Sequence, residues 1–204
     1  MGFDKLAAPL AGRPVLLKTL EAFLAATSIA EVVIVCSIER WQDIDPSLFS
    51  KPVRRVDGGI DRQDSVMAGL AAVSTAAELV AIHDGARPLI SPQAINRCVA
   101  AATEHGAAAL ARRVTETVKR ADSENFNATA VCREQLWLME TPQVFEIPLL
   151  RQAYAAVSAQ NLAVTDEVSA MEVLGIRVKF VESEHPNLKI TTPADLLLAA
   201  ALLR

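Results

Sequence analysis

Cysteine, basic runs and long apolar runs are all scarce in this 204-residue chain. Cys36, Cys98 and Cys132 lie far apart and without metal-ligand spacing, which argues against a zinc site or a disulfide framework. No basic run exceeds two residues and the net charge is −4, so no nucleic-acid surface is indicated. No uninterrupted apolar stretch could span a bilayer, and Asp4 and Lys5 fall too early for a secretory signal. These absences predict a cytoplasmic protein that binds neither membrane nor nucleic acid.

Half of the residues are apolar, which is enough for the core of one domain covering residues 1–204. Strand-like and helix-like segments alternate along most of the chain. The expected strands cover residues 31–37, 53–56, 79–82, 107–113 and 177–182. The expected helices cover residues 14–27, 65–77, 92–104, 148–159 and 166–174, with a last helix from Pro193, and Ser91, Thr165 and Thr192 as N-caps. This alternation predicts an α/β fold with three layers, in which helices cover both faces of a mostly parallel sheet.

Residues 114–145 interrupt this alternation. They consist of short extended segments around the polar turn at residues 122–125 and have no helical period. We interpret this part of the chain as a protruding β-arm.

Three polar segments follow predicted strands or lie beside their ends. The first is the glycine pair Gly58-Gly59, the second carries Asp84 and Arg87, and the third carries Lys189. In open α/β sheets, ligands bind outside the carboxyl ends of the strands, so these segments are expected to meet at one rim. A carboxylate that can bind Mg²⁺, placed beside a guanidinium and an ammonium, is typical of phosphate chemistry.

Each segment also has an ordinary structural interpretation. The glycine pair could form a plain turn before a helix capped by Ser65 or Asp64. Asp84 and Arg87 could form a structural ion pair, and Lys189 could be a surface lysine. His83 is expected to point into the core with one ring nitrogen bonded to the backbone.

Taken together, the motifs resemble those of the 2-C-methyl-D-erythritol 4-phosphate cytidylyltransferase family, in the same order and almost end to end. The matching motifs are Gly58-Gly59-x-x-Arg62-x-x-Ser65, His83-Asp84-x-Ala86-Arg87-Pro88, Thr117-Val118-Lys119, Thr141-Pro142-Gln143, Thr165-Asp166-Glu167 and Asn187-Leu188-Lys189-Ile190-Thr191. The resemblance implies a Rossmann-like nucleotidyltransferase fold. It also implies a reaction in which methylerythritol phosphate attacks the α-phosphorus of CTP and releases pyrophosphate, with Mg²⁺ as cofactor.

The resemblance also implies roles for single residues on the nucleotide side of the site. Catalytic roles fall to Lys5 and Lys189 at the CTP phosphates, and to Asp84. The residues matching the CTP site are Gly58, Gly59, Arg62, Ser65 and Asp84, and Asp84 is also the implied metal ligand.

On the acceptor side, the implied ligands within one chain are Arg87, Thr141 and Thr165. In the family the arm crosses to the second subunit of a homodimer and completes its site. By this resemblance, Thr117 and Arg133 would bind the acceptor in the partner subunit.

One departure concerns the start of the chain. The family opens with a strand and a glycine-rich loop ending in Arg-Met-Gly, and Met1-Gly2 match only the last two residues of that loop. We therefore expect the strand and loop to belong to a longer protein.

Three other functions remain open. One is a cytidylyltransferase for another sugar-alcohol phosphate, such as ribitol 5-phosphate, and another is a non-catalytic nucleotide-binding dimer. A dinucleotide-binding oxidoreductase is disfavoured, because a complete G-x-G-x-x-G after a first strand is absent.

Overall fold

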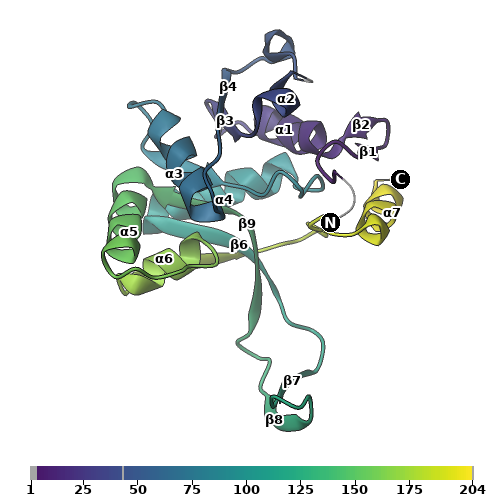
Figure 1. Cartoon of the computed structure of the whole chain (residues 1–204), viewed down its shortest axis with the longest axis vertical. Coiled ribbons are helices and arrows are strands. Elements are labelled where there is room, and N and C mark those ends of the chain that lie inside the picture. Colours follow the sequence, from purple (N-terminus) through teal and green to yellow (C-terminus); the bar gives the residue numbers. More distant parts are fainter. Residues whose placement is uncertain (1–3, 43, 204) are drawn as a thin grey trace.

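The computed structural model describes residues 4–42 and 44–203 (Figure 1). The predicted match of Met1-Gly2 to the family's loop lies outside these residues. The elements are β1 (Pro9–Leu10), β2 (Arg13–Pro14), α1 (Val15–Ala25), β3 (Val32–Val35), α2 (Ile38–Trp41), the 3-10 turn η1 (Pro46–Leu48), β4 (Val53–Val56), α3 (Arg62–Ala72), β5 (Leu79–Ile82), α4 (Pro92–His105), β6 (Ala107–Arg113), β7 (Val118–Ala121), β8 (Asn127–Val131), β9 (Trp137–Glu146), α5 (Ile147–Ala159), α6 (Glu167–Val173), β10 (Lys179–Glu182) and α7 (Pro193–Leu202).

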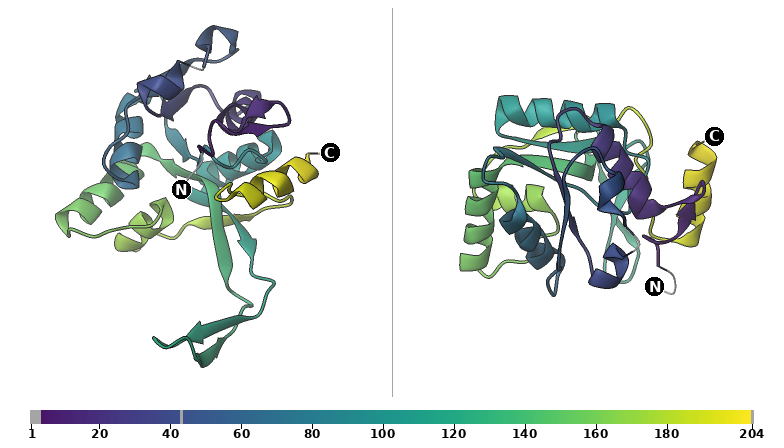
Figure 2. Two further views of the ribbon diagram at one scale, coloured as in Figure 1. Left: turned by 45° about the vertical axis from the view of Figure 1, so that its right-hand side comes forward. Right: turned by 90° about the horizontal axis from the view of Figure 1, so that it is seen from above.

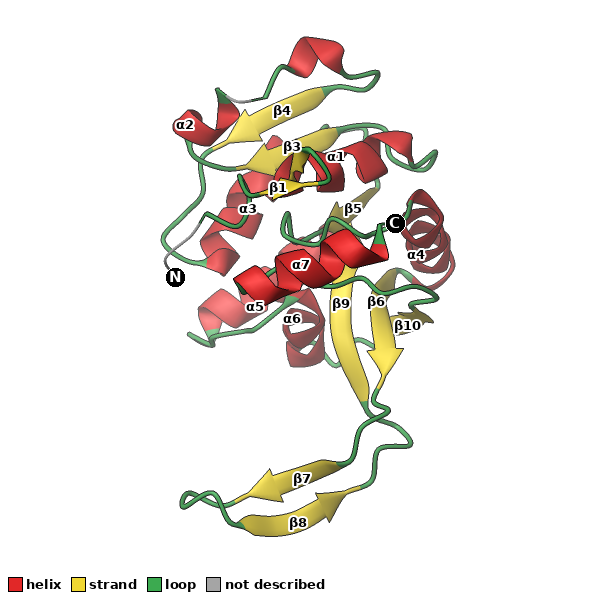
Figure 3. Cartoon of the chain, turned by 90° about the vertical axis from the view of Figure 1, so that its right-hand side faces the viewer, coloured by secondary structure: helices red, strands yellow, loops and turns green. Residues whose placement is uncertain are grey.

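Four strands form the main sheet, in the order β10-β6-β9-β5 (Figure 3). Strand β6 runs parallel to β10, whereas β9 runs antiparallel to both of its neighbours, β6 and β5. Strands β3 and β4 pair in parallel as a separate two-stranded sheet.

Side chains that alternate along the strands build a core on each face of the main sheet. Ala108 and Val144 pack with Cys98 of α4 on one face. Ala109 and Phe145 pack with α5 and α6 on the other face. The views in Figure 2 show α4 and the α5–α6 pair on opposite sides of the strands. The predicted three-layer α/β arrangement is therefore confirmed. The main sheet is mixed rather than mostly parallel, because β9 runs antiparallel to both of its neighbours.

The predicted strands at residues 53–56, 79–82 and 107–113 match β4, β5 and β6 residue for residue. Two helix N-caps differ from those predicted. Helix α3 begins at Arg62 rather than Ser65, because the side chain of Asp61 accepts from the Asp64 N–H and caps it. Helix α6 is capped by Asp166 rather than Thr165, since the Asp166 carboxylate accepts from the Ser169 N–H at 2.9 Å.

The arm is a hairpin of β7 and β8 that projects away from the body (Figures 1 and 3). Residues 114–145 also contain most of β9, which the sequence did not reveal. The second half of β9 is buried in the main sheet, where Val144 and Phe145 are 0% exposed. Among the described residues, no helix is both long enough and apolar enough to cross a bilayer.

Candidate active site

A cleft of about 390 Å³ opens beside the main sheet and collects side chains from five parts of the chain. Its walls come from the start of α3, the segment after β5, the middle of β9, α6 with the residues just before it, and β10 with the segment after it. Six of the residues predicted from the sequence line it: Arg62, Asp84, Arg87, Thr141, Thr165 and Lys189. The predicted convergence at one rim is therefore confirmed for these residues, whereas the glycine pair Gly58-Gly59, which was expected to join them, does not line the cleft.

The carboxylate of Asp84 joins two of the predicted cations. Its Oδ2 atom lies 3.0 Å from the Lys189 ammonium and 3.2 Å from Nε of Arg87. Burial by itself raises the pKa of Asp84, but the Lys189 ammonium and the Arg87 guanidinium outweigh burial and lower that pKa overall. Asp84 is therefore ionised at neutral pH.

Hydrogen bonds to neighbouring segments hold the chain around Lys189 in place. The Arg87 guanidinium donates through Nη1 to the Asn187 carbonyl at 2.8 Å. The side chain of Asn187, 5% exposed, donates to the Thr141 carbonyl at 2.8 Å. The N–H of Ile190 donates to the Ala86 carbonyl at 2.8 Å. The position of Lys189 is thus set by strand ends that are distant in sequence.

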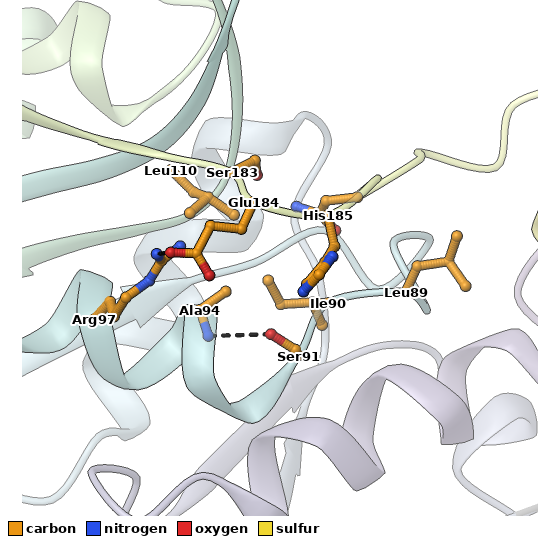
Figure 4. Close-up of a pocket in the computed structure, with 10 residues that line it drawn as sticks. Leu89, Ile90, Ser91, Ala94, Arg97, Leu110, Ser183, Glu184 and His185 are labelled. Atoms are coloured by element: carbon orange, nitrogen blue, oxygen red, sulfur yellow. Dashed lines mark hydrogen bonds and ion pairs between the residues drawn. The ribbon is translucent and has the colours of Figure 1, made fainter. Parts of the chain in front are cut away.

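A second, smaller cavity lies between α4 and the chain after β10 (Figure 4). There the guanidinium of Arg97 on α4 pairs with Glu184 and donates to the Glu182 carbonyl at 3.0 Å. Figure 4 shows the Arg97 and Glu184 side chains in contact among the residues that line this cavity. These contacts tie the chain between β10 and Lys189 to the helix that covers the sheet.

His83 is placed as the sequence predicted. Its ring packs on Phe23 with centroids 4.8 Å apart, and Nε2 lies 3.4 Å from the Arg87 carbonyl. Burial lowers the pKa of His83 to about 4, so the imidazole is neutral. Nδ1 lies 3.0 Å from the Thr141 hydroxyl, which also accepts from the Asp84 N–H at 3.1 Å. Thr141 therefore ties β9 to the segment that carries Asp84.

The glycine pair forms a tight loop before α3. The Gly59 N–H donates to the Ser65 hydroxyl at 3.1 Å, and that hydroxyl donates to the Asp61 carbonyl at 2.9 Å. A Cβ added at Gly59 would lie 2.1 Å from Cβ of Asp64, so only glycine fits there. Ser65 thus shapes the loop in which Gly58 and Gly59 lie.

The partner of Arg62 was not predicted from the sequence. Both terminal nitrogens of this guanidinium bind the carboxylate of Glu167, at 2.5 and 2.8 Å. Glu167 is 0% exposed, and its hydrogen bonds to the guanidinium, together with its charge, raise the pKa of Arg62. Glu167 stood in a motif already singled out, directly after Thr165-Asp166, but sequence spacing does not pair it with a residue about a hundred positions away.

Gln143 was also missed, although it belongs to the Thr141-Pro142-Gln143 motif. Its side-chain oxygen accepts from the N–H groups of Glu167 and Val168, both at 3.1 Å, and its amide donates to Asp166 at 2.9 Å. This side chain fixes the start of α6 beside the cleft.

Besides Gly58, Gly59 and Ser65 of the loop before α3, three predicted residues lie outside the lining of the cleft, namely Lys5, Thr117 and Arg133. Lys5 precedes Leu6, whose side chain packs in a cluster with Ala86 and Ile190, near Asp84 and Lys189. Thr117 and Arg133 lie on the arm, where Arg133 donates to the Thr115 carbonyl of the same chain. The roles predicted for these three residues stay predictions.

The cleft suits a metal ion bound mainly by a ligand. Among the described residues, no group of three or more His, Cys, Asp or Glu side chains is arranged to hold a metal. Asp84 offers one ionised carboxylate, and Mg²⁺ at phosphate sites uses one or two carboxylates together with phosphate oxygens and water. The residues present therefore fit Mg²⁺ delivered with a nucleotide.

Comparison with known proteins identifies the family. The sequence profile described as "IspD: 2-C-methyl-D-erythritol 4-phosphate cytidylyltransferase" matches residues 1–204. The enzyme of that name from Synechococcus sp. (strain CC9902) is 42% identical over 208 residues, covering 100% of this chain and 92% of the relative. The enzyme from Oryza sativa subsp. japonica, named as chloroplastic, is 40% identical over 96% of this chain and 66% of the relative.

Solved structures agree with this assignment. The crystal structure of 2-C-methyl-D-erythritol 4-phosphate cytidylyltransferase from Thermus thermophilus has a TM-score of 0.82 and 35% identity, covering 98% of this chain and 93% of that one. The structure of 4-diphosphocytidyl-2C-methyl-D-erythritol synthase from Anaerococcus prevotii has a TM-score of 0.90 and 30% identity, covering 97% of this chain and 92% of that one. The expected nucleotidyltransferase fold is thereby confirmed, and the chain belongs to the 2-C-methyl-D-erythritol 4-phosphate cytidylyltransferase family.

Proposed function

We propose that this protein transfers the cytidylyl group of CTP to 2-C-methyl-D-erythritol 4-phosphate and releases pyrophosphate. The observation that carries the proposal is the Lys189–Asp84–Arg87 cluster, in which one carboxylate oxygen binds both cations at the wall of the cleft. Family membership supplies the two substrates. The same cluster would serve the alternative acceptor, ribitol 5-phosphate, so the choice of acceptor is part of the proposal.

The chemistry needs charge stabilisation more than proton transfer. A phosphate monoester has a second pKa near ~6, so the attacking phosphate is already largely dianionic at neutral pH. Its oxygen attacks the α-phosphorus, a new P–O bond forms and the bond to pyrophosphate breaks. With its pKa lowered to about 4 by burial, the imidazole of His83 is a weak base, which is consistent with a site that employs no general base. The Lys189 ammonium is placed to stabilise the charge that develops on the α-phosphate.

Arg87 suits the acceptor phosphate. A guanidinium carries five N–H groups, and Arg87 points Nε–H at Asp84 and one Nη1–H at the Asn187 carbonyl. The remaining N–H groups are available for phosphate oxygens. Thr165 at the start of α6 lies on the same cleft. We assign Arg87, Thr141 and Thr165 to the acceptor side on this basis.

The lining of the cleft is not positive enough to hold two polyanions. Among the described residues that line it, three are basic and four carry carboxyl groups, namely Arg62, Arg87 and Lys189 against Asp84, Glu140, Asp166 and Glu172. We propose that Asp84 holds Mg²⁺, which would neutralise phosphate charge when bound with CTP. Lys5 would add another positive charge at the triphosphate.

The same shortage of positive charge supports a homodimer with shared sites. The arm carries Thr117 and Arg133 away from the cleft of its own chain (Figure 1). We propose that both residues reach the acceptor in the partner subunit. We also propose a cytoplasmic location, because the reaction draws on a nucleoside triphosphate.

Pyrophosphate release tests the proposal. With CTP, Mg²⁺ and methylerythritol phosphate, the protein is expected to release pyrophosphate and form the cytidylyl product, seen by phosphorus NMR. A reaction without acceptor is the control. A preference for ribitol 5-phosphate would reject the chosen acceptor. No turnover with either acceptor, together with CTP binding by calorimetry, would favour the non-catalytic alternative.

A further inference from the structure

Glu167 buries a negative charge that the proposed reaction does not use. Its side chain is 0% exposed, and its carboxylate accepts from three donors on two other elements. Two are Nη1 and Nη2 of Arg62, at 2.5 and 2.8 Å, and the third is the hydroxyl of Tyr154 on α5, at 2.9 Å. Such an arrangement fixes the guanidinium in one plane and at one position.

Stability alone is a poor explanation for this pair. Removing a carboxylate from water is costly, and a buried ion pair often stabilises a protein no more than apolar residues of the same shape would. Arg62 also remains partly in solvent, with 40% of its side chain exposed. What the bidentate contact supplies is a defined position for Arg62 at the wall of the cleft.

The position of Arg62 also determines the position of the glycine loop, residues 58–61. Arg62 is the first residue of α3 and follows this loop directly. All four loop residues are exposed, and Ile60 is 101% exposed, so the loop has no anchor in the core. The bond from the Gly59 N–H to Ser65 closes the loop onto α3 but does not fix α3 to the cleft. Leu70 and Val66 pack α3 into the core, and the contact with Glu167 holds its first turn at the cleft.

The other end of the contact is rigid. Glu167 is the first residue of α6, and Gln143 of β9 binds its N–H at 3.1 Å. Gln143 is 1% exposed and lies two positions from Thr141 on the same strand. The contact therefore links the predicted nucleotide loop to the strand and helix start that line the acceptor side.

We propose that Glu167 is a positioning residue for the nucleotide, acting through Arg62, with Tyr154 in support. The inference rests on the proposed transfer reaction, because it assigns the loop at residues 58–61 to CTP. This role leads to an expectation that position in the sequence alone would not give. Glu167 lies two residues from Thr165 on the acceptor side, yet its substitution is expected to raise mainly the KM for CTP.

Steady-state kinetics on the full chain provide the test. Glu167→Gln keeps the size of the side chain and loses the charge that holds both nitrogens of Arg62. We expect the KM for CTP to rise ~10-fold or more, because a small displacement of a binding loop is expensive. The KM for methylerythritol phosphate and kcat are expected to stay within ~3-fold. Tyr154→Phe removes one of the three donors and is expected to give a smaller shift in the same direction.

The matched control is Glu21→Gln. Glu21 on α1 is also paired with an arginine, Arg13, but that pair is exposed and lies outside the lining of the cleft. Both KM values are expected to match those of the unmodified protein. Hydrogen exchange gives a second readout, since the amides of residues 58–61 are expected to exchange faster in Glu167→Gln and to stay unchanged in Glu21→Gln.

The outcomes separate this inference from the proposed function. If the unmodified protein is active and Glu167→Gln raises only the acceptor KM, or neither KM, the positioning role is overturned. If the unmodified protein turns over no acceptor, the proposed function fails, and unchanged exchange at residues 58–61 in Glu167→Gln would overturn the positioning role as well. If Glu167→Gln does not fold, Tyr154→Phe with unaltered KM for CTP would overturn it.

Discussion

A single oxygen atom joins two cations at the wall of the cleft. Oδ2 of Asp84 contacts both Lys189 and Arg87, which come from segments about a hundred residues apart in sequence. Without substrate, this contact keeps the Lys189 ammonium at the wall instead of in bulk water. An incoming phosphate therefore meets cations that are already in place, which lowers the cost of ordering them during the reaction.

Replacing Lys189 tests its part in the chemistry. Lys189→Ala is expected to lower kcat ~100-fold or more, on the scale of losing one contact to charge that develops in the transition state. Binding of CTP is expected to weaken less, because the nucleotide keeps its other contacts. Steady-state rates of pyrophosphate release would measure both effects.

Lys179→Ala is the control for that experiment. Lys179 is exposed on β10, and the side chain of its neighbour Phe180 is the one that lines the cleft, so Lys179 points to the other side of the strand. Its rate is expected to match that of the unmodified protein. A Lys189→Ala enzyme with near-normal kcat would remove Lys189 from the mechanism.

Whether the sequence could predict a site residue depended on the neighbours of that residue in the chain. Asp84, Arg87 and Lys189 could be found because each follows or flanks a recognisable strand end. Glu167 and Gln143 could not be assigned roles, because their functions depend on partners that only folding brings near, at 2.5 to 3.1 Å.

The same distinction holds for helices and strands. Strands β4, β5 and β6 were predicted residue for residue, since β-branched or apolar runs bounded by polar turns are local signals. Strand β9 was hidden inside the predicted arm, because strand direction and pairing are set by contacts across the sheet. Its buried residues Val144 and Phe145 stand next to polar ones, so the local pattern resembles that of the exposed hairpin.

The start of helix α7 could be predicted from the residues next to it in sequence. Thr192 was predicted as its N-cap, and the structure adds Asp195, which completes a capping box. The Asp195 carboxylate accepts from the Thr191 hydroxyl at 2.7 Å and from the N–H groups of Thr191 and Thr192. The Thr191 hydroxyl and these N–H groups lower the pKa of Asp195 to about 2.

This cap has a consequence for acid stability. The pKa of Asp195 is lower in the folded protein than its ordinary value of 3.8, so its stabilising effect is present above pH 3.8 and is lost as the pH falls through about 2. Asp195→Asn is expected to be less stable than the unmodified protein at pH 5, and the difference is expected to shrink at pH 3. Urea unfolding at the two pH values would measure it.

Thr192→Ala serves as the companion variant for the cap. Loss of a threonine N-cap costs about 1 kcal/mol, and the groups with the largest effects on the pKa of Asp195, at Thr191, remain in this variant. Equal destabilisation of Asp195→Asn at pH 5 and pH 3 would contradict the assignment of the acid effect to Asp195.

Over the whole molecule, the charge of the cleft and the shape of the arm both favour the proposed homodimer. The cleft is lined by more carboxyl groups than basic groups, whereas Arg133 sits on an arm that extends away from the body (Figure 3). An arm without a core of its own, made of two short strands with mostly exposed side chains, gains stability by packing on another surface. A second copy of the chain would supply such a surface and would bring its own arm in return, because a two-fold interface is reciprocal.

Mixed dimers test whether sites are shared. Arg133→Ala and Asp84→Ala are each expected to be nearly inactive as pure dimers, the first through weak acceptor binding and the second through loss of the cluster around Lys189. In a mixed dimer, the cleft of the Arg133→Ala chain keeps Asp84 and receives an intact arm from its partner, so one of the two sites is complete. Random mixing makes half of the dimers mixed, and about a quarter of the original activity is expected to return. Pyrophosphate release before and after the variants exchange subunits would measure the recovery. No recovery, with exchange verified by mass spectrometry of tagged chains, would mean that each site is complete within one chain and that Arg133 does not serve a partner.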